Sequence, residues 1–300
     1  MDTVRTPDHR FTDLPGYPFE PHYAEIPDGD GGTLRVHYLD EGLSNGPVVL
    51  LMHGEPSWSY LYRGMIPPLV SAGYRVIAPD LVGFGRSDKP TEMTDYSYAR
   101  HVVWASSLIF DHLDLQDITF FGQDWGGLIG LRLVADQPDR YERVAIGNTG
   151  LPTGEGGSEA FMAWQKFSQE SPVFPIGKLV NGACISDLSD EVIAAYDAPF
   201  PDDSYKAGAR IFPSLVPTNS DDPEASANKA AWKVLEQFER PFLVAFSDLD
   251  PVTKGGETPF LARVPGAQGQ PHTTIEGAGH FLQEDQGPLL AALLVDFMAS

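Results

Sequence analysis

Short apolar runs recur along the first half of the chain, and each ends at a turn residue. The runs are either rich in β-branched residues or wholly apolar, and a Gly, Pro or Asp follows them. This pattern is typical of strands buried on both faces of a sheet. Together with a strand predicted at Leu34–Leu39, the expected strands are Pro47–Met52, Tyr74–Ala78, Ile118–Phe121 and Val144–Gly147.

Helical patterns separate several of these strands. Tyr98–Leu113 carries apolar residues near helical spacing, and Gly126–Gln137 follows the turn after a strand. Strands that alternate with helices predict a parallel, doubly wound sheet. In such a sheet the active site forms at the carboxyl ends of the strands. Residues at those ends are therefore the candidates for catalysis.

The alternation of strands and helices stops after Gly150. Residues 151–218 are rich in Pro and Phe and contain short helical patterns, such as Glu159–Ser168 and Asp190–Tyr196, but no convincing strand. We therefore predict a helical insertion, here called the cap (residues 151–218), which we expect to lie over the strand ends.

The sheet pattern resumes after the cap. Strands are expected at 242–246 and 272–276, and an amphipathic helix at 289–298 closes the chain. The predicted fold is thus an α/β core, residues 1–150 and 219–300, interrupted by the cap.

Composition and charge exclude several classes of protein. Of the 300 residues, 42% are apolar and 21% are charged, which is the balance of an ordinary globular protein. The net charge of −22 repels phosphate backbones and anionic lipid, so we expect no nucleic-acid and no membrane partner. No apolar run approaches the length of a bilayer span. We expect the protein to act as a monomer.

The cysteine content and the N-terminus bear on the compartment. Cys184 is the one cysteine, which rules out an internal disulfide and a thiolate zinc cluster. Residues 1–8 have neither the apolar stretch nor the cleavage site of a signal peptide. These features predict a cytoplasmic protein, although a cysteine-poor periplasmic protein would look the same.

The strongest local motif is the segment Gly122–Gly127, which reads GQDWGG and follows a predicted strand. Small residues on both sides of a central side chain allow a tight strand-to-helix turn, the nucleophile elbow. The turn raises its central residue at the helix N-terminus, where the amides favour negative charge. Here that residue is Asp124, and a simple helix N-cap is the alternative role for it.

An aspartate at the elbow indicates the type of reaction. A carboxylate that attacks an acyl group gives an anhydride-like intermediate, which is a poor route to ester hydrolysis. A carboxylate that attacks a saturated carbon gives an ordinary ester, which water can then hydrolyse. Asp124 therefore predicts displacement at an sp³ carbon through a covalent alkyl-enzyme.

Hydrolysis of such an ester needs a base, and His280 is the candidate. It lies in a glycine-rich loop after the last predicted strand and follows the nucleophile in the chain. His53 also follows a strand, but it opens a turn that is better suited to placing backbone amides.

An acid is expected to fix the tautomer of the histidine. The strand at 144–147 is followed by Asn148, which cannot carry charge. The later strand is followed by Asp248 and Asp250, and both could fill the role. We favour Asp250, with Asp248 as a solvated loop acid. Backbone N–H groups of Glu55 and Trp125 are the expected oxyanion donors.

At these residues the chain resembles the α/β-hydrolase superfamily and, within it, the haloalkane dehalogenases. The resemblance covers most of the chain. It rests on His53–Tyr60, Asp80–Pro90, the Asp124 elbow, the His280 loop, and the cap segments Phe161–Trp164 and Tyr196–Asp202.

The resemblance implies a cofactor-free and metal-free hydrolase that acts on small halogenated aliphatic substrates and releases a halide ion. Indole N–H groups suit a halide because they donate and do not accept. In this family the second donor is either an Asn after His-Gly or a cap Trp. Glu55 occupies the first position here, so the resemblance assigns Trp125 and Trp164 to the halide. It also places Phe161 in the same pocket and gives Glu55 a part in holding the hydrolytic water.

The match is to the first dehalogenase subfamily, with an Asp-His-Asp triad and two tryptophans. An epoxide hydrolase is the main alternative, since it would use Asp124 in the same way. It would need Tyr196 or Tyr205 to protonate the ring oxygen, and it usually carries an aromatic residue in place of Glu55. A non-catalytic ligand-binding homologue is the remote alternative, but all three triad positions are filled.

Overall fold

The computed structural model describes residues 1–300 and contains one large sheet of eight strands. The strand order is β10-β9-β8-β7-β4-β5-β3-β2, and β1 and β6 form a separate antiparallel pair. The strands are β1 (Thr3–Val4), β2 (His22–Pro27), β3 (Thr33–Glu41), β4 (Val48–Met52), β5 (Arg75–Pro79), β6 (Lys89–Pro90), β7 (Ile118–Gln123), β8 (Tyr141–Gly147), β9 (Phe242–Ser247) and β10 (Thr273–Ile275).

The predicted parallel sheet is confirmed from β10 to β5. Its central strand β7 is buried along its whole length, as expected for a strand covered on both faces. Strand β2, which was not predicted, pairs antiparallel with β3, and β3 pairs antiparallel with β5. The side chains of β2 are partly exposed in alternation, so this edge strand lacks the continuous apolar run that marks the others.

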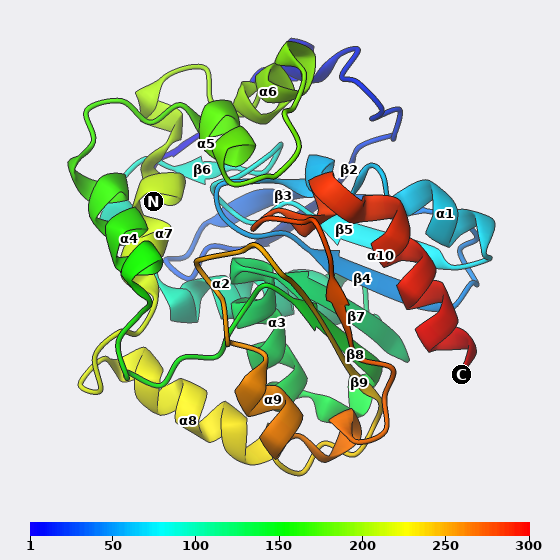
Figure 1. Cartoon of the computed structure of the whole chain (residues 1–300). Coiled ribbons are helices and arrows are strands. Elements are labelled where there is room, and N and C mark those ends of the chain that lie inside the picture. The colour runs from blue at the N-terminus through cyan, green and yellow to red at the C-terminus, as the bar shows by residue number, and fades with distance from the viewer.

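Ten α-helices surround the sheet (Figure 1). They are α1 (Ile66–Ser71), α2 (Tyr98–Ser106), α3 (Trp125–Asp136), α4 (Glu159–Glu170), α5 (Ile176–Gly182), α6 (Asp190–Asp197), α7 (Ala207–Leu215), α8 (Pro223–Leu235), α9 (Thr258–Arg263) and α10 (Leu282–Ala299).

Two helices begin or end at other residues than the sequence predicted. The helix expected at 98–113 is α2 followed by a wider π-helical segment, Ser107–His112. The closing helix begins at Leu282, earlier than expected, and breaks at Gln286. Pro288 follows that break and has no backbone N–H for the helix ladder, which accounts for the interruption.

The chain between β8 and β9 forms helices and no strand. Figure 1 shows α4, α5, α6 and α7 grouped at the upper left, whereas α8 lies at the bottom of the view with α9. The apolar side chains of the cap are not a separate core. Phe174, Tyr196 and Phe212 belong to the same buried cluster as the sheet residues.

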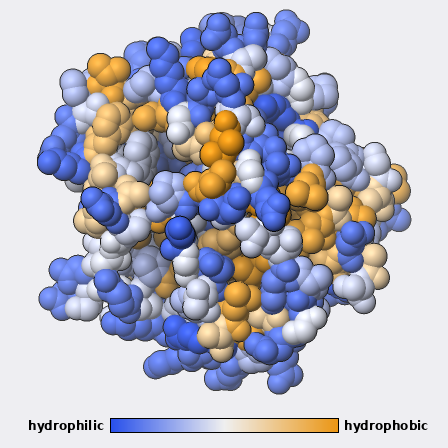
Figure 2. Space-filling model, viewed as in Figure 1, coloured by the Kyte–Doolittle hydropathy of each residue, from blue (hydrophilic) through white to orange (hydrophobic).

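The surface is mixed in polarity. Figure 2 shows hydrophilic residues over most of this face, with apolar residues in separate groups. None of the helices combines the length and the apolar character that crossing a bilayer requires.

Candidate active site

Asp124 stands at a sharp turn between β7 and α3. Its φ is 51°, in the left-handed region, which is strained for a side chain with a Cβ. Its N–H donates to the carbonyl of Asn148 over 2.9 Å. Its carboxylate makes no capping hydrogen bond to α3, so the N-cap alternative does not describe this residue.

The glycines around Asp124 are needed for close approach rather than for flexibility. A Cβ on Gly126 would collide with the carbonyl oxygen of Met52 at the end of β4. A Cβ on Gly54 would collide with the carboxylate of Asp124. The elbow and the loop after β4 are therefore pressed together, which brings backbone donors to the carboxylate.

One of the two expected oxyanion donors lies in place. The N–H of Glu55 donates to Oδ1 of Asp124 over 2.7 Å. Trp125 follows Asp124 directly as the first residue of α3, and its N–H makes no hydrogen bond with that carboxylate.

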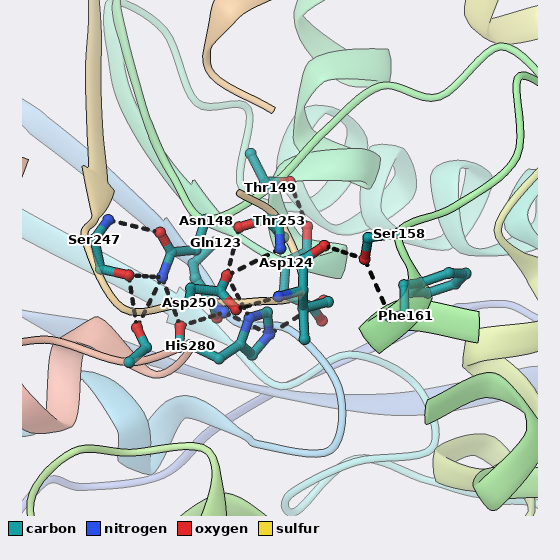
Figure 3. Close-up of polar contacts among 12 residues, drawn as sticks. Gln123, Asp124, Asn148, Thr149, Ser158, Phe161, Ser247, Asp250, Thr253 and His280 are labelled. Atoms are coloured by element: carbon teal, nitrogen blue, oxygen red, sulfur yellow. Dashed lines mark hydrogen bonds and ion pairs between the residues drawn. The ribbon is translucent and has the colours of Figure 1, made fainter. Parts of the chain in front are cut away.

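His280 lies between two carboxylates (Figure 3). Its Nδ1 is 3.0 Å from Oδ2 of Asp250, and its Nε2 is 3.5 Å from Oδ2 of Asp124. Burial lowers the pKa of His280, but the charges of the two carboxylates and the hydrogen bonds to them outweigh burial and raise the pKa to about 10. In this state the imidazole is protonated.

Asp250 is the acid that faces His280. Its side chain is 1% exposed, and it also accepts hydrogen bonds from the N–H of Val252 and from the hydroxyl of Thr253. Burial alone would raise the pKa of Asp250. The charge and hydrogen bond of His280, with those of Thr253 and Val252, hold it at about 2.

Asp248 points to a different part of the loop. It is exposed, and its Oδ1 accepts the N–H of Gly277 over 2.9 Å. It is thus more than a solvated loop acid, since it ties the end of β9 to the loop that carries His280. The sequence offered no signal for that contact.

Asn148 is a residue whose importance the sequence did not reveal. Its Nδ2 donates to the hydroxyl of Ser247 and to the carbonyls of Gly279 and His280, and its Oδ1 accepts the N–H of Ser247 (Figure 3). One side chain therefore fastens the ends of β8 and β9 to the histidine loop. An aspartate could not donate these three bonds.

Gln123, the last residue of β7, also supports the base. Its Nε2 lies 3.1 Å from Nε2 of His280 and donates to the carbonyl of His280 over 3.1 Å (Figure 3). Because Gln123 precedes Asp124 in the chain, the side chains of Asp124 and His280 are both positioned from the end of β7.

A cap segment contacts the backbone of His280. The N–H of His280 donates to the carbonyl of Ala183 over 2.8 Å. Asp285, near the start of α10, accepts the N–H groups of Gly279, Ile185 and Ser186. The histidine loop and the cap residues after α5 are therefore joined by hydrogen bonds.

The motifs around His53 and Asp80 shape the loops near the site. His53 accepts the N–H of Leu81 on Nε2, which leaves Nδ1 as the donor to the carbonyl of Gly54. Asp80 is fully buried, pairs with His37, and accepts the N–H groups of Ser59 and Arg86. Neither residue lines the cavity at Asp124, in agreement with a structural part for His53.

Two adjoining cavities open onto Asp124. The inner cavity, of about 290 Å³, is lined by Glu55, Trp164, Lys178 and His280 among others. The outer cavity, of about 470 Å³, has Leu128, Leu151, Val216 and Trp232 in its wall. Both cavities are also lined by Asp124, Trp125, Phe161 and Val252.

The predicted pocket residues meet in the inner cavity. Trp125 and Phe161 line it, and Trp164 donates its indole N–H to Oε2 of Glu55 over 3.2 Å. The other three tryptophans are structural, as expected from the sequence. Each is buried and donates its indole N–H to a backbone carbonyl: Trp58 to Ala195, Trp104 to Asp28 and Trp232 to Leu151.

The tyrosines needed by an epoxide hydrolase lie elsewhere. Tyr196 is fully buried and donates its hydroxyl to Glu284, which also pairs with Arg63. Neither Tyr196 nor Tyr205 lines a cavity at Asp124. The geometry therefore gives an opening epoxide no phenol to protonate it.

No group of three His, Cys, Asp or Glu side chains is arranged to hold a metal ion. The groups that meet at the cavity are the carboxylate of Asp124 with one backbone donor, the histidine between two acids, and the indoles of Trp125 and Trp164.

Comparison with known proteins gives one family. A family model described as the alpha/beta hydrolase fold matches residues 47–286. The chain is 58% identical to a haloalkane dehalogenase of Psychrobacter cryohalolentis, over 99% of this chain and 98% of the relative. It is 52% identical to a haloalkane dehalogenase of Mycobacterium marinum, over 99% of this chain and all of the relative.

The fold agrees with a solved structure as well. The structure of the tetrameric haloalkane dehalogenase of Paraglaciecola agarilytica superposes with a TM-score of 0.92 at 37% identity, over 100% of this chain and 99% of the other. By full-length similarity and by fold, the chain belongs to the haloalkane dehalogenases of the α/β-hydrolase fold, hydrolases that act on the carbon–halogen bonds of halogenated alkanes.

Proposed function

We propose that Asp124 is the nucleophile of this dehalogenase. One carboxylate oxygen attacks the carbon that bears the halogen, so a C–O bond forms as the C–X bond breaks and the halide leaves with its electron pair. The hydrogen bond from the N–H of Glu55 fixes Oδ1 of Asp124. Its position at the junction of the two cavities supports this role.

His280 then acts as the base for water, oriented by Asp250. Water loses a proton to His280 and attacks the carbonyl carbon of the ester, and the alcohol leaves as the Asp124 carboxylate is restored. The oxyanion is stabilised by the N–H groups of Glu55 and Trp125. The net reaction converts a haloalkane and water into an alcohol, a halide ion and a proton, without a cofactor.

The charge on Asp124 controls the state of His280 in this scheme. In the resting protein Asp124 helps to raise the pKa of His280, so the imidazole is protonated. Ester formation removes that charge, which lowers the pKa. His280 then releases its proton to solvent, which is the proton of the net reaction, and becomes the base that accepts a proton from water. In Asp124→Asn, which imitates the loss of charge, the imidazole should titrate at lower pH by NMR, whereas Asp248→Asn should leave it unchanged.

We assign the halide to the indoles of Trp125 and Trp164, with Phe161 against the alkyl group and Glu55 beside the hydrolytic water. This is the arrangement of the first dehalogenase subfamily, to which we assign the chain. Residues 151–218 act as the cap that closes the cavity, with Trp164 and Phe161 on its helix α4.

The single observation that carries the proposal is the placement of His280 between Asp124 and Asp250. His280→Phe should form the alkyl-enzyme but not hydrolyse it. After incubation with 1-bromobutane, the mass of the intact variant should rise by one butyl group, and one halide per protein should be released. A variant that stays unmodified after long incubation would contradict the scheme.

A second experiment tests the substrate class. Halide release from 1,2-dibromoethane and 1-bromobutane should vanish in Asp124→Asn, and styrene oxide should give no diol. Diol formation without halide release would move the assignment to an epoxide hydrolase.

Two further properties belong to the proposal. We propose that the protein acts as a monomer. Light scattering in solution decides between this state and a tetramer like that of the Paraglaciecola relative. We also propose a cytoplasmic location, which cell fractionation tests.

A further inference from the structure

The carboxyl group of Glu55 has an unusual environment. The residue is 4% exposed. The one hydrogen bond that its carboxyl group makes is the 3.2 Å bond from the indole N–H of Trp164 to Oε2. Its other oxygen, Oε1, is buried and has no hydrogen-bond partner in the protein. An ionised carboxylate accepts several hydrogen bonds in water, so burying it with a single donor is costly.

The charges that face Glu55 are mixed. Asp124 lies at the end of β7 and is held by the N–H of Glu55 itself, so a second negative charge here would be repelled. His280 and, from α5, Lys178 line the same cavity and favour the charged form. Burial and the charge of Asp124 outweigh the Trp164 bond and the charge of His280, and raise the pKa of Glu55 well above its usual value.

The donor that Glu55 uses is the one that the halide requires. In the proposed function the N–H of Trp164 binds the departing halide, whereas in this structure it binds Oε2. One N–H cannot serve both acceptors at full strength. A carboxylate is a stronger acceptor than a neutral carboxyl group, and it would also repel the halide. The protonation state of Glu55 therefore decides which acceptor keeps the indole.

We propose that Glu55 is a neutral carboxylic acid in the resting protein and that its proton governs halide binding: the neutral acid gives up the Trp164 N–H to a halide, and the carboxylate retains it. This inference rests on the proposed halide site of Trp125 and Trp164. It makes Glu55 a positioning residue for the leaving-group site. Above the pKa of Glu55, binding of one halide is accompanied by uptake of one proton.

Bromide binding tests the proposal without turnover. The quenching of tryptophan fluorescence by bromide gives its Kd across a series of pH values. In the wild type the Kd should rise by up to about tenfold per pH unit once the pH exceeds the pKa of Glu55. In Glu55→Gln, whose amide cannot ionise, the Kd should be independent of pH. Glu170→Gln, an exposed change on α4, should behave as the wild type.

Infrared difference spectra test the proton directly. At neutral pH the wild type should show the carbonyl band of a protonated carboxylic acid that Glu55→Gln lacks, and bromide should shift that band. Circular dichroism checks that the variant is folded. The proposal is overturned if the band is absent, or if Glu55→Gln keeps the pH dependence of the wild type, which would assign it to His280.

A failure of the Glu55 proposal can be distinguished from a failure of the proposed reaction. Trapping of the alkyl-enzyme in His280→Phe reports on Asp124 and His280 whatever the state of Glu55. A trapped ester together with a pH-independent Kd in the wild type and no acid band would leave the reaction scheme standing and refute the role of Glu55.

Discussion

The half of the active site that comes from the sheet and the half that comes from the cap are held in different ways. Asp124, His280 and Asp250 follow strands and are joined to each other and to Asn148 and Gln123 by hydrogen bonds. Trp164 and Phe161 lie on α4, are partly exposed, and have one polar contact with the core, the Trp164–Glu55 bond. The comparison shows that hydrogen bonds hold the residues that follow strands, while apolar packing and a single hydrogen bond hold the residues of α4.

Removing the nucleophile should have the largest effect. Asp124→Asn leaves the fold intact but offers a poor nucleophile, so halide release from 1,2-dibromoethane should fall by at least about a thousandfold. Ion chromatography of the released bromide measures it. A variant that retained a tenth of the wild-type rate would contradict the assignment of Asp124 as the nucleophile.

The two acids after β9 should differ sharply. Asp250→Asn removes the charge that orients His280 and should lower turnover by about 10³-fold to 10⁴-fold. Asp248→Asn, the matched control on the same loop, keeps an acceptor oxygen for the N–H groups of Gly277 and Ala278 and should change turnover by no more than a few-fold. Equal losses in the two variants would mean that the loop as a whole, and not the Asp250 contact, sets the rate.

A cap tryptophan should contribute less than a triad member. Trp164→Phe keeps the ring but removes the N–H, so kcat/KM should fall by about 10-fold to 100-fold, or roughly 1.5–3 kcal/mol of lost halide stabilisation. Trp104→Phe also removes a buried indole N–H, but far from the cavities at Asp124. It should lower thermal stability and leave bromide affinity as it is.

Filling the outer cavity should change substrate choice by a modest factor. Val216→Phe adds volume to the wall of that cavity, so activity on 1-bromohexane should fall several-fold while activity on 1,2-dibromoethane changes little. Val173→Phe, an exposed change in the cap, serves as the control. If both substrates lose activity equally, the outer cavity does not hold the alkyl chain.

A last expected effect is on the stability of the fold against pH rather than on turnover. The pKa of His280 is raised from 6.5 to about 10 on folding, so its contribution to stability is complete below about pH 6.5 and is lost as the pH rises to about 10. Urea unfolding at a series of pH values should show a decline over this range in the wild type that is weaker in His280→Phe. If the free energy of unfolding declined equally with pH in the wild type and in His280→Phe, groups other than His280 would cause the pH dependence.

The sequence predicted that Asp124, His280 and Asp250 would lie together because their signals are local, and the structure places them within hydrogen-bonding or ion-pair distance of His280. The glycines beside Asp124 indicate an elbow, and the position of His280 in a loop after the last strand marks it as a candidate base. Strand β3 was predicted at Leu34–Leu39, but its antiparallel partner β2 was not, because β2 mixes polar and apolar side chains at an edge. The part played by Asn148 escaped because it depends on the meeting of β8, β9 and the His280 loop, which no single segment encodes.

The contacts of the cap half could not be predicted at all from the pattern of residues. Trp164 was assigned through its resemblance to a family position, and its bond to Glu55 joins side chains 109 residues apart. Indoles on helices usually read as packing residues, and three of the five tryptophans are packing residues. Only the spatial meeting of α4 with the loop after β4 separates Trp164 from these.

The hydrogen bond from His280 to the carbonyl of Ala183 has a consequence for protein engineering. A chimera that exchanges caps between dehalogenases at residues 151–218 would also exchange the acceptor of the base's own backbone N–H. Because this acceptor is a backbone carbonyl, single substitutions near residue 183 keep it, whereas insertions or deletions that move the backbone there would disturb ester hydrolysis as well. Keeping residues 183–186 with Asp285 as one transplanted unit would let recombination alter substrate range while the hydrolytic step is inherited unchanged.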